Sequence, residues 1–133
     1  MVCSRLHAVG GTTVLTPNDA GDAVAGGAHN TAVGYNAAAS TTTGKVSAFG
    51  ASALQANTTG INNAAFGGAT DAYGAALNNN TTGSYNSAFG YSALRTNTTG
   101  ANNSALGFSA LLVTTTGAGL TAIGWSPLTT NTT

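Results

Sequence analysis

Apolar and small residues alternate along short segments of this chain. The clearest segment starts at Ser87, where Phe89 and Tyr91 alternate with Ala88 and Gly90. A period of two is the pattern of a β-strand, whose successive side chains point to opposite faces. We therefore expect one face of large residues and one face of small residues that lets another backbone approach closely.

The glycine of this pattern marks a repeat of about 17 residues. The steps between its six copies are 16, 17, 23, 17 and 17 residues, at Gly34, Gly50, Gly67, Gly90, Gly107 and Gly124. Units that recur at a short fixed period bury a face only by stacking on their neighbours. With two strands and two turns expected per copy, we predict an all-β fold, a narrow parallel β-solenoid of about six coils of 16–17 residues.

Two apolar columns are predicted to form the core of this solenoid. The first column precedes the repeat glycine and contains Val33, Phe49, Phe66, Phe89, Leu106 and Ile123. The second column follows the glycine by four residues and contains Leu54, Leu94, Leu111 and Leu128. Such a core is small against an ordering cost of about 1–2 kcal/mol per residue. We therefore expect several copies to share one apolar axis, as an intertwined or side-by-side homotrimer.

Each copy ends in a turn rich in Thr and Asn that is closed by glycine. The turn glycines are Gly44, Gly60, Gly83, Gly100 and Gly117. Glycine accepts positive φ without steric cost, which predicts that conformation in these turns. Stacked turns also predict an Asn ladder that hydrogen-bonds to itself along the axis. A flat array of Thr would alternatively suit ice binding.

The chain divides into residues 1–29, which do not follow the repeat, and residues 30–133, which do. We expect the first part to be an N-terminal cap or attachment segment, with a short strand near residues 12–15. The third copy carries six extra residues, which predict an inserted loop near 68–74. The last turn lacks its glycine, so we expect a fragment of a longer protein.

Ligand-type side chains are scarce. They gather only near the N-terminus, as His7, Asp19, Asp22 and His29. A metal site needs three or four convergent ligands, and the wide spacing of these residues favours ordinary surface or capping roles. We predict no metal and no cofactor, and without a nucleophile motif we predict no enzyme activity.

Charge narrows the partners further. Three basic and three acidic residues give a net charge of zero. No basic stripe can be assembled for nucleic acid. No apolar run is long enough to predict membrane insertion or a signal peptide.

One further column is aromatic in four copies: Tyr35, Tyr91, Phe108 and Trp125. Stacked packing within or between chains is one interpretation. The other is an exposed platform for a cell-surface glycan, because aromatic faces offer apolar contact at small entropic cost. The same repeats produce glycan-acceptor spacing, mostly as a by-product of Asn-Thr-Thr repetition, at Asn57, Asn80, Asn97, Asn102 and Asn131.

The repeats resemble those of bacteriophage tail fibres and, more distantly, the head repeats of trimeric autotransporter adhesins. The resemblance covers residues 30–133 and is carried by residues 30–35, 87–91, 104–108 and 121–125. It implies a homotrimer of left-handed parallel β-rolls with a structural or receptor-binding role.

We therefore expect a non-catalytic segment of a fibre, extracellular or on a virion surface, whose main partner is itself. The first alternative is a subunit that polymerises end to end into an extracellular filament. The second alternative is a module that binds glycan or ice.

Overall fold

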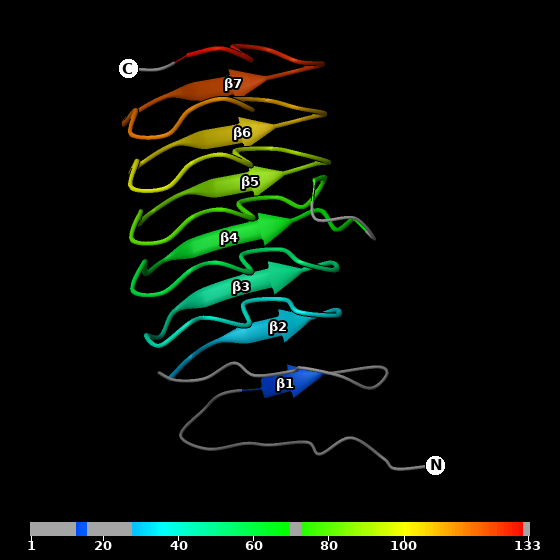
Figure 1. Ribbon diagram of the computed structural model, residues 1–133, viewed down its shortest axis with the longest axis vertical. Helices are drawn as coiled ribbons and strands as arrows, with labels where there is room; N and C mark the ends of the chain where they lie inside the picture. The colour runs from blue at the N-terminus through cyan, green and yellow to red at the C-terminus, as the bar shows by residue number, and fades with distance from the viewer. Residues whose placement is uncertain (1–12, 16–27, 70–72, 132–133) are drawn as a thin grey trace.

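Seven short strands form one parallel sheet in chain order in the computed structural model (Figure 1). The structure describes residues 13–15, 28–69 and 73–131, and these contain no helix. The strands are β1 (Thr13–Leu15), β2 (Thr31–Val33), β3 (Val46–Phe49), β4 (Asn63–Phe66), β5 (Ser87–Phe89), β6 (Ser104–Leu106) and β7 (Thr121–Ile123). One strand per coil lies above the last, which confirms the predicted parallel β-solenoid.

Successive strands pair in register. Phe89 in β5 lies opposite Phe66 in β4 and Leu106 in β6. The register holds although 23 residues separate β4 from β5 at this position. In Figure 1 the chain leaves the stack after β4 and returns to it before β5, so the insertion leaves the sheet undisturbed.

The sheet also includes β1, which pairs with β2 through Thr13 and Thr31. This strand belongs to residues 1–29, the expected cap or attachment segment. Residue 30 is therefore no boundary of the sheet. The other residues of that segment, except 28 and 29, lie outside the described part of the chain, and their role stays a prediction.

The return limb of each coil is not the second strand that the sequence suggested. After β5 the φ angles of Ser92 and Leu94 are 59° and 51°, in the left-handed region. The Ala93 N–H donates to the Gly90 carbonyl of its own coil at 3.3 Å, while the Leu94 N–H reaches the Ala110 carbonyl of the next coil at 2.9 Å. Residues of opposite backbone handedness alternate here, so the limb folds into consecutive tight turns instead of an extended strand.

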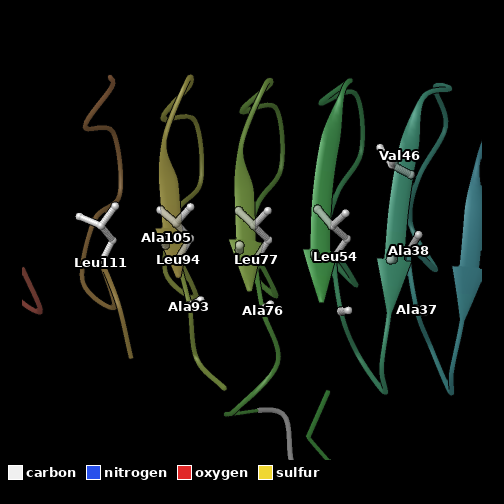
Figure 2. Packing of buried hydrophobic residues seen from close by; sticks show 14 of the residues in the cluster. Ala37, Ala38, Val46, Leu54, Ala76, Leu77, Ala93, Leu94, Ala105 and Leu111 are labelled. Carbon is white, nitrogen blue, oxygen red and sulfur yellow. The ribbon is translucent and has the colours of Figure 1, made fainter. Parts of the chain in front are cut away.

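A buried leucine stabilises each of these return limbs. Leu54, Leu77, Leu94 and Leu111 are fully buried and form one column (Figure 2). A left-handed conformation costs a non-glycine residue about 1–2 kcal/mol. Full burial of a leucine contributes about 1.5–3 kcal/mol, so packing offsets the backbone cost. Leu128, in the last described coil, is 51% exposed.

Alanine fills the strand side of the core. The strands β2 to β7 bury one alanine each, at Ala32, Ala48, Ala65, Ala88, Ala105 and Ala122. A second buried alanine precedes the leucine on the return limb, as Ala93 does in the coil of β5. Thus the two limbs are held together by methyl groups and one leucine per coil, a thin interior.

The first predicted core column points outward, and that part of the prediction is wrong. Because side chains alternate along β5, burial of Ala88 places Ser87 and Phe89 on the opposite face. The thin interior accepts a methyl group at this position, whereas the larger residues lie on the outside. Val33 and Phe49 are half-buried there, and Phe66, Phe89, Leu106 and Ile123 are exposed.

Candidate interaction surfaces

The outer face of the sheet carries a continuous apolar column, which we call the outer ladder. Its members are Val33, Phe49, Phe66, Phe89, Leu106 and Ile123. The rings of Phe49 and Phe66 stack with centroids 4.6 Å apart, and those of Phe66 and Phe89 stack at 4.8 Å. These spacings match the separation of neighbouring strands in a sheet, so the register of the sheet aligns the rings.

A column of small residues runs beside the outer ladder on the same face. It contains Thr31, Ser47, Ala64, Ser87, Ser104 and Thr121. None of the strands β2 to β7 contains a charged residue. The described sheet therefore presents an apolar stripe and a mostly hydroxyl-bearing stripe, without charges that would repel a like surface.

A second aromatic column, the corner ladder, consists of Tyr91, Phe108 and Trp125. The ring centroids of Tyr91 and Phe108 are 5.2 Å apart, and those of Phe108 and Trp125 are 4.3 Å apart. Tyr35 occupies the same repeat position, but Ala51 and Gly68 separate it from Tyr91 along the stack. The structure thus brings together three of the four residues of the predicted platform.

Stacking within the corner ladder limits what its rings offer a ligand. Phe108 has a ring on each face, and Tyr91 and Trp125 have one face covered by it. Trp125 is 78% exposed and keeps its other face open. A sugar stacks on the face of a ring, so this geometry favours the packing interpretation over a multi-ring platform.

Glycines separate the two ladders and let the coils approach closely. Gly90 has a φ of 129°, and a Cβ there would overlap the carbonyl of Gly107 in the next coil. The predicted turn glycines differ from this pattern and from the prediction, because none of them has positive φ: Gly44, Gly60, Gly83, Gly100 and Gly117. A Cβ on Gly83 would instead overlap the carbonyl oxygen of Gly100. Close packing, and not backbone handedness, selects glycine in these turns.

The turns bury the predicted Asn ladder, which the structure confirms. Asn57, Asn80 and Asn97 are fully buried. The Nδ2 of Asn80 donates to Asn57 Oδ1 at 2.8 Å and to the Gly83 carbonyl at 2.9 Å. The Nδ2 of Asn97 donates in turn to Asn80 Oδ1 at 2.7 Å. This polar column therefore links consecutive coils inside the rod.

A second buried Asn column was not predicted from the sequence. It consists of Asn30, Asn63, Asn86 and Asn103. The Asn86 Oδ1 accepts the Asn103 N–H at 3.0 Å, and its Nδ2 donates to the Gly100 carbonyl at 2.8 Å. Each such residue clips its coil to the next one. Recurrence of Asn just before the strand in four copies was the signal available in the sequence.

Threonine hydroxyls of the turns are committed within the protein. The Oγ1 atoms of Thr58, Thr81 and Thr98 each donate at 3.0 Å to a threonine carbonyl of the next coil. Donors that are already paired have less to offer an ordered water layer. The geometry of this column therefore does not favour ice binding.

Side chains anchor the returning end of the insertion. The Arg95 Nη1 donates to the Tyr73 carbonyl at 2.8 Å, and the Ser92 Oγ donates to the same carbonyl at 3.0 Å. Tyr73 itself is exposed. The insertion thus presents an aromatic side chain beside the rod while its backbone is fixed.

The ligand-type residues contribute no assembled site to the described region. His29 is exposed, and His7, Asp19 and Asp22 lie outside the described residues. Across residues 13–15, 28–69 and 73–131 no three His, Cys, Asp or Glu side chains group together to hold a metal. No helix in this part of the chain has the length and apolar character needed to span a membrane.

Comparison of the chain with protein-family models, with curated proteins and with solved structures gave no match in any of the three.

Proposed function

We propose that this chain is a non-catalytic structural segment of a fibre, and that it works as a parallel homotrimer. Its mechanical element is the stack of coils, joined by backbone ladders and by two buried Asn columns. Its partners are a second and a third copy of itself. An extracellular or virion-surface location, with a contribution to host attachment, fits such a rod.

The outer ladder is the observation that carries this proposal. Contiguous apolar stripes exposed on a soluble protein mark interaction sites. Exposure within this ladder reaches 50% at Leu106 and 69% at Ile123. The stripe repeats with the rise of the coil, so a partner must present apolar groups at the same spacing. Another copy in parallel orientation supplies that spacing without adjustment.

The adjacent column supports the same arrangement. Ser87 and Ser104 lie beside Phe89 and Leu106 on an uncharged face. Small hydroxyl-bearing residues let a neighbouring backbone approach and can pair with polar groups of that neighbour. Identical faces without charge meet without electrostatic repulsion. A trimer buries three such stripes around one axis and covers each of them.

The test replaces ladder residues by the serine that already occupies the neighbouring column. Phe66→Ser with Phe89→Ser should convert the trimer to a monomer in light scattering, with the β-sheet circular dichroism retained. The matched control is Tyr91→Ala with Trp125→Ala in the corner ladder, which should leave the trimer intact. A monomeric parent chain, or dissociation caused only by the control pair, would refute the proposal.

Electron microscopy of the same samples separates the alternatives. Discrete short rods support the fibre segment, whereas indefinite filaments support end-to-end polymerisation. A glycan-binding role predicts that the corner-ladder variant stays trimeric but loses binding on a glycan array. Ice binding predicts thermal hysteresis of the parent chain.

A further inference from the structure

The glycan-acceptor sequences of this chain are not equivalent in the folded state. Asn57, Asn80 and Asn97 are fully buried, whereas Asn102 is exposed. The acceptor sequence of Asn131 extends into residues outside the described part of the chain. Among the predicted acceptors that the structure describes, the fold therefore offers Asn102 and withholds three others.

A further acceptor sequence escaped the prediction because it overlaps another one. Asn79 is followed by Asn80 and Thr81, which satisfies the acceptor spacing. Asn79 is exposed, whereas Asn80 beside it is fully buried. Two adjacent acceptors thus point to opposite environments, which provides a matched pair within one turn.

The chemistry of N-glycosylation conflicts with the Asn ladder. Transfer forms a bond between the Asn Nδ2 and C1 of an oligosaccharide, breaks the bond from C1 to a lipid diphosphate, and releases an Nδ2 proton to a base. The product amide keeps one N–H instead of two. Asn80 uses both of its donors, to Asn57 Oδ1 and to the Gly83 carbonyl. Asn97 likewise uses both, to Asn80 Oδ1 and to the Gly100 carbonyl.

Space is a second obstacle. The side chains of Asn57, Asn80 and Asn97 have no exposed surface. Each ladder amide has a coil on either side, and a Cβ on Gly60 or Gly83 would already overlap the side chains around it. A bulky, hydrophilic glycan cannot be placed there without separating the coils.

Asn102 has neither obstacle. It lies on the surface just before the buried Asn103, with a φ of 60°. The serine of its acceptor sequence, Ser104, is also exposed. A glycan on Asn102 would extend into solvent at the start of β6.

Asn79 has the space for a glycan but a less available acceptor hydroxyl. The Thr81 Oγ1 donates to the Thr98 carbonyl of the next coil at 3.0 Å. The hydroxyl of Ser104, in contrast, belongs to an exposed side chain. We therefore expect a transferase to modify Asn102 more readily than Asn79 in the folded chain.

We infer that N-glycosylation of Asn57, Asn80 or Asn97 and folding of this rod exclude each other, and that Asn79 and Asn102 are the described acceptors compatible with the fold. The glycosyl donor belongs to the lipid-diphosphate-linked oligosaccharides. The chain is therefore suited to folding where no oligosaccharyltransferase acts. This inference is independent of the proposed trimer.

The first test translates the full chain, fused to a secretory leader, with and without microsomes. Glycan occupancy is read by mass spectrometry of peptides, and folding is read as resistance to a broad-specificity protease. Each molecule should be either glycosylated at a ladder asparagine and protease-sensitive, or unmodified there and resistant.

A matched variant separates the ladder acceptors from the exposed ones. Thr59→Ala, Thr82→Ala and Thr99→Ala together remove the three ladder acceptor sequences at exposed threonines and keep the ladder asparagines. The acceptor sequences of Asn79 and Asn102 remain intact. This variant should be resistant to protease while it carries a glycan on Asn102.

A second arm offers purified, prefolded chain to an oligosaccharyltransferase with its lipid-linked donor. We expect modification of Asn102 and at least a tenfold lower occupancy of the three ladder asparagines. Resistant molecules that carry a glycan on Asn80 or Asn97 would overturn the exclusion. Failure to modify Asn102 in both arms would overturn its assignment as a compatible acceptor, and protease-sensitive molecules modified only at Asn79 would do the same for that residue.

Discussion

Replacement of Asn80 by leucine tests whether the buried Asn ladder holds the coils together. Leucine is a similar but larger side chain, so the change removes hydrogen bonds without opening a cavity. Asn57 Oδ1 then loses the Asn80 donor at 2.8 Å, and Asn97 Nδ2 loses one of its two acceptors. The Gly83 carbonyl keeps its second donor, Asn63 Nδ2 at 2.7 Å.

The magnitude follows from these losses. A buried polar atom left unpaired costs about 1–3 kcal/mol, and a lost neutral hydrogen bond costs about 1 kcal/mol. Asn80→Leu should therefore lower the free energy of unfolding by about 2–4 kcal/mol. For a chain of this length that corresponds to a fall in Tm of about 10 °C. Urea and thermal unfolding followed by far-UV circular dichroism measure both quantities.

The neighbouring residue provides the control. Asn79 is exposed, and Asn79→Ala should change the free energy of unfolding by less than about 0.5 kcal/mol. Simultaneous replacement of Asn57, Asn80 and Asn97 by leucine should cost less than the sum of the single changes, because the partners disappear together. A single Asn80→Leu variant as stable as the parent would show that apolar packing alone holds the stack.

Three further changes probe the ladder and the packing of the coils. Thr114→Asn should raise the free energy of unfolding by about 1–2 kcal/mol in urea unfolding, because Thr114 Oγ1 and Asn97 Oδ1 are buried without partners in the described region and an Asn would continue the ladder. Leu94→Ala should lower it by about 2–5 kcal/mol by opening a cavity, and a loss below about 1 kcal/mol would contradict the placement of this column. Gly107→Ala should cost more than Gly119→Ala in thermal unfolding, because both have positive φ but only Gly107 meets a neighbouring backbone; equal losses would refute the steric argument.

The repeat period made the stack of coils predictable from the sequence. Register followed from the constant step between equivalent residues, and the phase recovered after the insertion indicated that the sheet continues. The Asn ladder was predictable because Asn57, Asn80 and Asn97 recur beside turn glycines. These features depend on periodicity, which a sequence displays directly.

Which face points inward was not predictable from hydrophobicity. Alternation identified two faces, and the larger residues were assigned to the core. The interior instead takes alanine, because the two limbs lie close together. The better signal was constancy of size: the alanine of the strand recurs in all six copies, whereas its neighbour varies among Val, Phe, Leu and Ile.

The return limb also escaped prediction. Its left-handed residues include Ser92 and Leu94, which are not typical of positive φ. Tertiary packing fixes this conformation, since the buried leucine column and the hydrogen bonds to the next coil offset its local cost. No local preference of serine or leucine indicates it.

Stacking of one coil on the next is the claim from which the ladders, the proposed trimer and the buried acceptors all follow. Nuclear Overhauser contacts between alanine methyl groups of an isotope-labelled chain test it most directly. We predict contacts between Ala88 and Ala105 and between Ala105 and Ala122, one coil apart in each case. Contacts of helical spacing, or Ala88 paired with any residue other than Ala65 and Ala105 along the strands, would contradict it.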